Sequence, residues 1–140
     1  MLKYVVAYFS TGLVFLVADG IWLATMAPAV YRPRLAPVLA ETVSLGPAVA
    51  FYLLYIVGIV VFAVGPALES GRWSTAAGYG LLFGFFCYAT YDLTNQATLR
   101  TWSTTVTVLD IAWGAFATAV AATLGMLATS ALLDVIAADG

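Results

Sequence analysis

Three acidic side chains interrupt segments that are otherwise almost entirely apolar. Asp19, Asp92 and Asp110 each lie within a long hydrophobic run of the chain. An ionisable side chain at the centre of a membrane-crossing helix costs about 3 kcal/mol on insertion scales, and such residues usually mark a functional site. Carboxylates at low dielectric constant can carry protons, hold cations or bind amines, and several in one place are not all expected to be ionised.

The three aspartates are expected to lie at one depth in a membrane. Asp19 and Asp92 each stand seven residues before the end of an apolar segment, and Asp110 stands five residues after the start of another. A helix rises 1.5 Å per residue, so each carboxylate is predicted to lie roughly 8–10 Å from the same membrane surface. Three helices would thus bring their carboxylates to one layer.

Aromatic side chains accompany the acids at helical spacing. Trp22 and Trp113 each come three residues after an aspartate, which places an indole N–H one helical turn from a carboxylate. Tyrosines and an asparagine on the neighbouring segments are expected to face the same layer. The predicted pocket for a ligand or a proton consists of Asp19, Asp92, Asp110, Asn95, Trp22, Trp113, Tyr88, Tyr91, Tyr52 and Tyr55.

A purely structural role for these residues is also open. Asp110 is placed to cap a helix, because 111–133 still suffices to cross a bilayer. Asp92 is placed to belong to a frayed helix end, whereas Asp19 has no such alternative because 4–18 is too short to cross. Carboxylates can also accept hydrogen bonds from Tyr, Trp, Asn and Thr across helices, and so fix the bundle without any ligand.

The composition identifies the setting of these acids. Of 140 residues, 64% are hydrophobic and only 9% are charged, with a mean hydropathy of +1.02. Soluble domains carry roughly a quarter charged residues, so an ordinary soluble fold and a disordered chain are both excluded. Segments of about 20 residues or more, long enough to cross a hydrocarbon core of roughly 30 Å, are expected at about 4–26, 45–68, 73–99 and 105–133. We therefore predict a single transmembrane domain, 1–140: an all-α integral membrane bundle of four transmembrane helices, with short loops and both termini on the same side.

Prolines, glycines and charges mark the connections. The predicted breaks hold Pro28, Pro33 and Pro37 in the first, Gly65-Pro66 and Ser70-Gly71 in the second, and residues 100–103 in the third. Tyr31 is expected to be an interfacial aromatic residue, and Gly80 and Gly84 to form a small-residue packing pair. The first segment is long for a signal peptide and contains Asp19, so it is retained as a helix. Three Lys and Arg residues against two weakly favour termini outside the cytoplasm.

The residue types that are missing exclude several classes of site. The chain has no histidine, which excludes haem, di-iron and zinc sites of the usual histidine kind and every Ser-His or Cys-His catalytic arrangement. We accordingly assign no catalytic residue, metal or cofactor. The net charge of −2 and the absence of basic runs give no electrostatic footprint for nucleic acid. Cys87 is expected to be a buried structural thiol.

Five stretches carry a recognisable pattern beyond their hydropathy. They are residues 4–9 (YVVAYF), 19–23 (DGIWL), 52–55 (YLLY), 88–95 (YATYDLTN) and 110–114 (DIAWG). Together they resemble a bacterial membrane protein family, domain of unknown function 2177, over nearly the whole chain. The resemblance implies a small, four-span, multi-pass protein of the bacterial inner (cytoplasmic) membrane, and it implies no activity, cofactor or catalytic residue.

Three kinds of function fit these observations. The first is binding, and by extension transport, of a proton, a cation or a small amphiphilic molecule in an intramembrane pocket of acids and aromatic side chains. The second is a structural or accessory subunit of a larger membrane complex. The third, a membrane-embedded enzyme acting on a lipid-like substrate, is less favoured because few basic groups are present to hold a phosphate. The expected partners are the lipid bilayer and either further copies of the chain or a larger membrane complex, with no nucleic acid.

Overall fold

The computed structural model describes residues 1–138, which are helical apart from short connections and include no strand. The elements in chain order are α1 (Leu2–Met26), η1 (Ala27–Tyr31), α2 (Arg32–Leu35), α3 (Leu45–Ile59), η2 (Val60–Val64), α4 (Gly65–Ser70), α5 (Trp73–Thr98) and α6 (Thr104–Ala138). The two η elements are π-helical turns that continue their neighbours, so four long helical units result. The predicted all-α class is confirmed.

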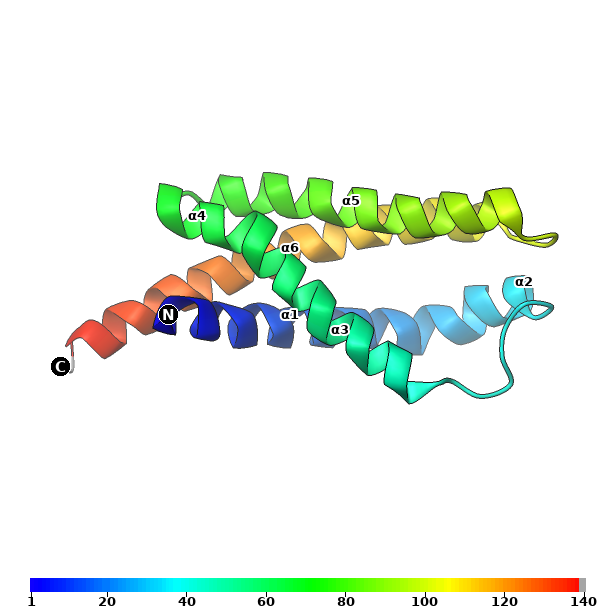
Figure 1. Ribbon diagram of the computed structural model, residues 1–140, viewed down its shortest axis with the longest axis horizontal. Helices are drawn as coiled ribbons and strands as arrows, with labels where there is room; N and C mark the ends of the chain where they lie inside the picture. Colours follow the sequence, from blue (N-terminus) through cyan, green and yellow to red (C-terminus); the bar gives the residue numbers. More distant parts are fainter. Residues whose placement is uncertain (139–140) are drawn as a thin grey trace.

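The long helices run roughly along one axis of the molecule, except that α3 crosses the others obliquely (Figure 1). The start of α1 and the end of α6 lie at one end of this axis, and the connections 36–44 and 99–103 lie at the other. Helix α6 packs against both α5 and α1. The fold therefore places the predicted acidic segments of α1, α5 and α6 toward the same end.

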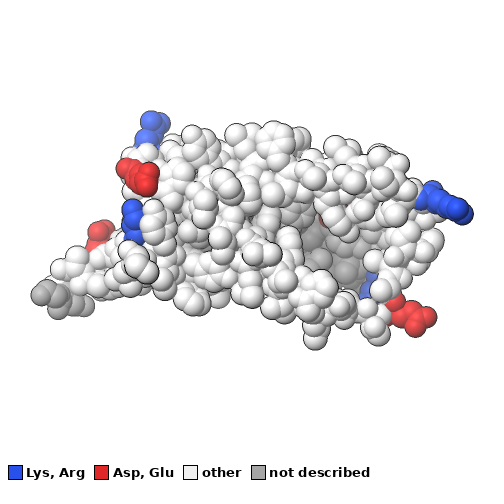
Figure 2. Space-filling model, in the orientation of Figure 1, with Lys and Arg blue, Asp and Glu red and all other residues white. Residues whose placement is uncertain are grey.

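The surface is that of a membrane protein. On the face that Figure 2 shows, charged side chains gather at the two ends of the long axis, and the surface between them is almost free of charge. Three helical units, Leu2–Leu35, Leu45–Ser70 and Thr104–Ala138, are long and apolar enough to cross a bilayer. Helix α5 has 26 residues, which is sufficient length, but it is less apolar than the other three units. A fourth crossing therefore stays a prediction.

Two of the predicted breaks are shorter than expected: the helices continue through Pro28, Pro33 and Pro66, and the connections occur at 36–44, which contains Pro37, and at Gly71. Each π turn ends two residues before a proline, η1 before Pro33 and η2 before Pro66. A proline inside a helix donates no hydrogen bond, and its ring clashes with the carbonyl four residues earlier. A widened π turn gives that ring room and lets the chain stay helical. The second unit ends instead at Gly71, whose φ of 66° is the left-handed conformation that glycine adopts readily.

Glycines bring α5 and α6 into close contact. The Cα of Gly80 faces Ala122 and the Thr118 carbonyl, and the Cα of Gly84 faces Thr118 and the Gly114 carbonyl. A methyl group added at either position would meet these atoms, so the two backbones approach as closely as they do only because side chains are missing there. The predicted packing role of the Gly80 and Gly84 pair is confirmed.

The substitution Gly84→Ala is expected to destabilise the bundle by about 1–3 kcal/mol, because the new methyl group has no space against α6. The matched control is Gly78→Ala on the same helix, where nothing lies within 4 Å of the added carbon. Unfolding of the purified protein by a denaturing detergent measures both. Equal stability losses in the two variants would contradict the close contact at Gly84.

Candidate functional site

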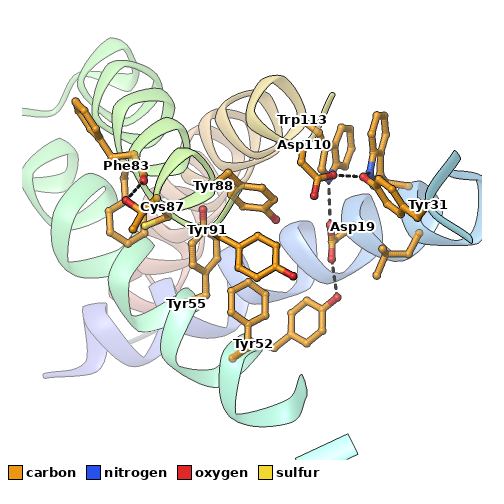
Figure 3. Close-up of a pocket in the computed structure, with 15 residues that line it drawn as sticks. Asp19, Tyr31, Tyr52, Tyr55, Phe83, Cys87, Tyr88, Tyr91, Asp110 and Trp113 are labelled. Carbon is orange, nitrogen blue, oxygen red and sulfur yellow. Dashed lines mark hydrogen bonds between the residues drawn. The ribbon is translucent and has the colours of Figure 1, made fainter. Parts of the chain in front are cut away.

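A cavity of about 860 Å³ lies between α1, η1, α3, α5 and α6. Its walls are mainly aromatic, and its polar groups come from two aspartates and several hydroxyl groups (Figure 3). The lining residues are Asp19, Trp22, Leu23, Tyr31, Phe51, Tyr52, Tyr55, Phe83, Phe86, Cys87, Tyr88, Thr90, Tyr91, Asp110 and Trp113. Among these lining residues there is no lysine and no arginine.

Both oxygens of the Asp19 carboxylate accept hydrogen bonds from aromatic side chains. Tyr52 of α3 donates its hydroxyl to Oδ2 at 2.5 Å, and Trp113 of α6 donates its indole N–H to Oδ1 at 3.0 Å. Asp19 itself is 5% exposed. Because its donors come from two other helices, this one carboxylate connects α1, α3 and α6.

The Asp110 carboxylate is reached through Tyr31. The Tyr31 hydroxyl donates to Oδ1 of Asp110 and accepts a hydrogen bond of 2.6 Å from the indole N–H of Trp22. Within the part of the chain that the structure describes, no side chain donates to Oδ2 of Asp110. The Asp110 carboxylate therefore lines the cavity with its Oδ2 atom available to accept a hydrogen bond from a ligand.

The hydrogen-bonded groups around Asp19 and around Asp110 are in contact through two stacked indole rings. Trp22 and Trp113 lie face to face, with ring centroids 4.3 Å apart and planes 4° from parallel. Each indole is hydrogen-bonded toward a carboxylate on the other helix. Trp113 of α6 donates directly to Asp19 of α1. Trp22 of α1 donates to Tyr31, which in turn donates to Asp110 of α6. The repeated Asp-x-x-Trp spacing thus produces a reciprocal arrangement between α1 and α6.

The structure brings together eight of the ten residues that the sequence placed in a pocket. Asp19, Asp110, Trp22, Trp113, Tyr52, Tyr55, Tyr88 and Tyr91 all line the cavity. Asn95 and Asp92 do not line it. Asp92 is fully buried, and neither of its oxygens has a hydrogen-bond partner among residues 1–138. Whether the eight bind a ligand or a proton stays a prediction.

Both helix-end alternatives for the acids are wrong. Asp110 lies six residues inside α6, which begins at Thr104, so it does not cap that helix. Asp92 lies inside α5, which continues to Thr98, so it does not belong to a frayed end. Each of these aspartates therefore lies within a helix. Its backbone groups form helical hydrogen bonds, so its carboxylate depends on side chains of other helices for hydrogen bonds.

Sequence reasoning missed Tyr31, which it placed at the membrane interface. The chain was expected to leave the helix at the prolines that flank Tyr31, whereas η1 keeps it helical and brings the tyrosine against Asp110. The aromatic side chains Phe51, Phe83 and Phe86 were also missed, because their types do not distinguish a cavity wall from a lipid-facing surface. Cys87 is half-buried and lines the cavity, where full burial had been expected.

The site combines carboxylates with aromatic faces, and this combination suits cations. An organic cation gains from a carboxylate and from the negative faces of tyrosine and tryptophan rings. A compact metal ion prefers several oxygen ligands at short range, and no group of three or more Asp, Glu or Cys side chains among residues 1–138 is arranged to hold one. The volume lies within the range of roughly 300–1,000 Å³ that is typical of small-molecule sites.

The substitution Tyr52→Phe is expected to destabilise the protein by about 1–3 kcal/mol, because Oδ2 of the buried Asp19 then lacks a donor. Tyr79→Phe is the control, since Tyr79 is 50% exposed on α5 and away from the cavity. In the Asp19→Asn background the effect of Tyr52→Phe is expected to differ, and the detergent unfolding free energies of all four proteins give the coupling. If the stability losses of the two single variants simply add up in the double variant, there is no hydrogen bond between Tyr52 and Asp19.

The family comparison covers most of the chain. The family described as "Predicted membrane protein (DUF2177)" matches residues 4–127. No curated protein and no solved structure matches the chain. The match spans well over half of the sequence and agrees with the nearly charge-free surface between the two charged ends on the face that Figure 2 shows. The chain therefore belongs to the DUF2177 family of predicted membrane proteins.

Proposed function

We propose that this membrane protein binds a small organic cation in the cavity between α1, α3, α5 and α6. The observation that carries the proposal is the composition of the cavity wall, which contains two carboxylates, aromatic rings and no basic side chain. A cavity with this lining attracts positive charge and excludes negative charge. Binding is the core of the proposal, and transport of the cation or of a proton would be an extension of it.

The two carboxylates have different roles in this proposal. Both oxygens of Asp19 are occupied by Tyr52 and Trp113, so Asp19 holds the walls in place and contributes its charge at a distance. Among residues 1–138, Asp110 accepts a side-chain hydrogen bond from Tyr31 alone and offers its second oxygen to the cavity. Asp110 is therefore the residue that contacts an ammonium group directly.

One observation favours the alternative of a structural subunit. The hydrogen bonds at Asp19 and the stacked indoles would stabilise the bundle even if the cavity held nothing but lipid. In that case the acids serve only to fix helix packing. The two functions differ in what Asp110→Asn does, because only a binding protein loses affinity for a cation.

We further propose that the chain crosses the inner membrane of a bacterium four times. Helix α5 is long enough to cross, and it packs along α6, so its polar side chains are sheltered by protein. Polar residues that face the bundle interior are tolerated in crossing helices. Association with further copies or with other membrane subunits belongs to the same proposal.

The substitution Asp110→Asn is expected to weaken binding of dodecylamine about tenfold or more, because a charge-assisted contact contributes about 1.5–3 kcal/mol. Binding is measured by tryptophan fluorescence in nanodiscs of phosphatidylcholine, since Trp22 and Trp113 form part of the cavity wall. The control is Asp134→Asn, which makes the same change of charge at an exposed position of α6.

Dodecanol provides the neutral counterpart of the ligand, and it is expected to bind far more weakly than dodecylamine. Equal binding of the amine and the alcohol, or equal affinity of the Asp110→Asn and Asp134→Asn variants, would overturn the proposal. A loss of folded protein with unchanged affinity in the folded fraction would support the structural alternative.

A further inference from the structure

We infer that the cavity is filled sideways from the bilayer, and that its occupant is a single-chain amphiphile with a cationic head. This inference rests on the proposed function. It adds the path by which the ligand enters the cavity and the apolar chain that is attached to its cationic group. The amphiphile would come from the leaflet on the side of the 36–44 and 99–103 connections.

The opening lies between α3 and α5. These helices diverge away from η2, because α3 crosses the bundle obliquely (Figure 1), and the space-filling view shows a hollow on this face (Figure 2). Three lining residues are also exposed on the outer surface: Phe51 at 43%, Phe86 at 62% and Tyr91 at 60%. The rim is thus aromatic and faces the region that lipid chains occupy.

The cavity is polar at one end and apolar at the other (Figure 3). Asp110 lies about 9 Å along α6 from its start at the 99–103 connection, at 1.5 Å per residue. Phe83 lies about 22 Å along α5 from the same connection, close to the middle of that helix. Asp110 therefore lies near the membrane surface, and Phe83 lies near the bilayer centre.

This polarity matches an amphiphile that already stands in the leaflet. Its head group would lie at the depth of Asp110, and its chain would extend along Phe86 toward Phe83. A bilayer hydrocarbon core of roughly 30 Å gives each leaflet about 15 Å. The distance between the two ends of the cavity is thus comparable with the depth of one leaflet, so the molecule could enter without turning over.

Other occupants fit less well. The acyl chain of an ordinary phospholipid would fill the apolar end but would bring no positive charge to Asp110. A small hydrophilic cation would satisfy Asp110 and leave the space around Phe83, Phe86 and Cys87 without apolar contacts. Only a molecule with both parts uses both ends of the cavity.

Chain length gives the first test. In phosphatidylcholine nanodiscs, dodecylamine is expected to bind at least tenfold more tightly than butylamine, and Phe86→Ala is expected to reduce that advantage. The control Phe9→Ala removes an aromatic side chain that is 70% exposed on α1 and does not line the cavity. The control corrects for simple partition of the amine into lipid, because partition is the same for both variants.

The outcomes separate this inference from the proposed function. If butylamine binds as tightly as dodecylamine and both depend on Asp110, the cation site stands and the amphiphile is excluded. Equal effects of Phe86→Ala and Phe9→Ala would overturn the opening between α3 and α5. If neither amine binds, the proposed function fails and this inference fails with it.

Photolabelling tests the orientation of the chain. A dodecylamine that carries a diazirine at the far end of its chain is expected to label the peptide that contains Phe83 and Phe86. Labelling of the peptide that contains Tyr31 instead would place the chain at the acidic end and would overturn the orientation. Mass spectrometry of the digested protein locates the label.

Discussion

A carboxylate inside a bilayer has no water with which to form hydrogen bonds, so its partners must come from the protein. In this molecule those partners are aromatic, and they come from other helices. Asp19 on α1 is bonded by Tyr52 of α3 and Trp113 of α6, and Asp110 on α6 is bonded by Tyr31 of η1. The arrangement of α1, α3 and α6 at this end of the bundle follows from these bonds. Since each donor is also part of the cavity wall, the same contacts that stabilise the helices shape the space between them.

The other end of the bundle is held differently. There close helix contacts are made at glycines, at Gly80 and Gly84 of α5 against α6 and at Gly125 of α6 against Thr11 of α1. Helix α3 itself has few contacts with α5. The helical unit that it begins packs against α5 at its π turn, η2. Glycines therefore set the closest approaches of the helices, whereas large aromatic side chains form the walls of the cavity. The two regions share residues, because the cavity-lining rings of Tyr88 and Phe83 pack directly on Gly114 and Gly58.

The sequence was sufficient for the helices and for part of the site. Hydropathy located the long helical units to within a few residues at most ends, and the spacing of Asp19 and Trp22 predicted one face of α1. Distance from a helix end predicts depth but not rotation: Tyr91 lines the cavity, whereas Asp92, about 100° further round α5, is buried away from it. The oblique course of α3 was also beyond sequence reasoning, because no local pattern specifies the angle between helices.

The π turn at Ala27–Tyr31 has a consequence for how the site is encoded. A π turn holds one residue more than an α-helical turn, so removal of a single residue there would restore regular geometry. Because the turn itself absorbs the extra residue, the helix on either side would keep its register, and the deletion would rearrange only the residues of the turn, including Tyr31 at its end, which donates to Asp110. The length of this short segment is therefore as much a part of the site as any side chain. Among homologous chains, an insertion or deletion between Trp22 and Tyr31 would mark a different site even where every aromatic residue is retained.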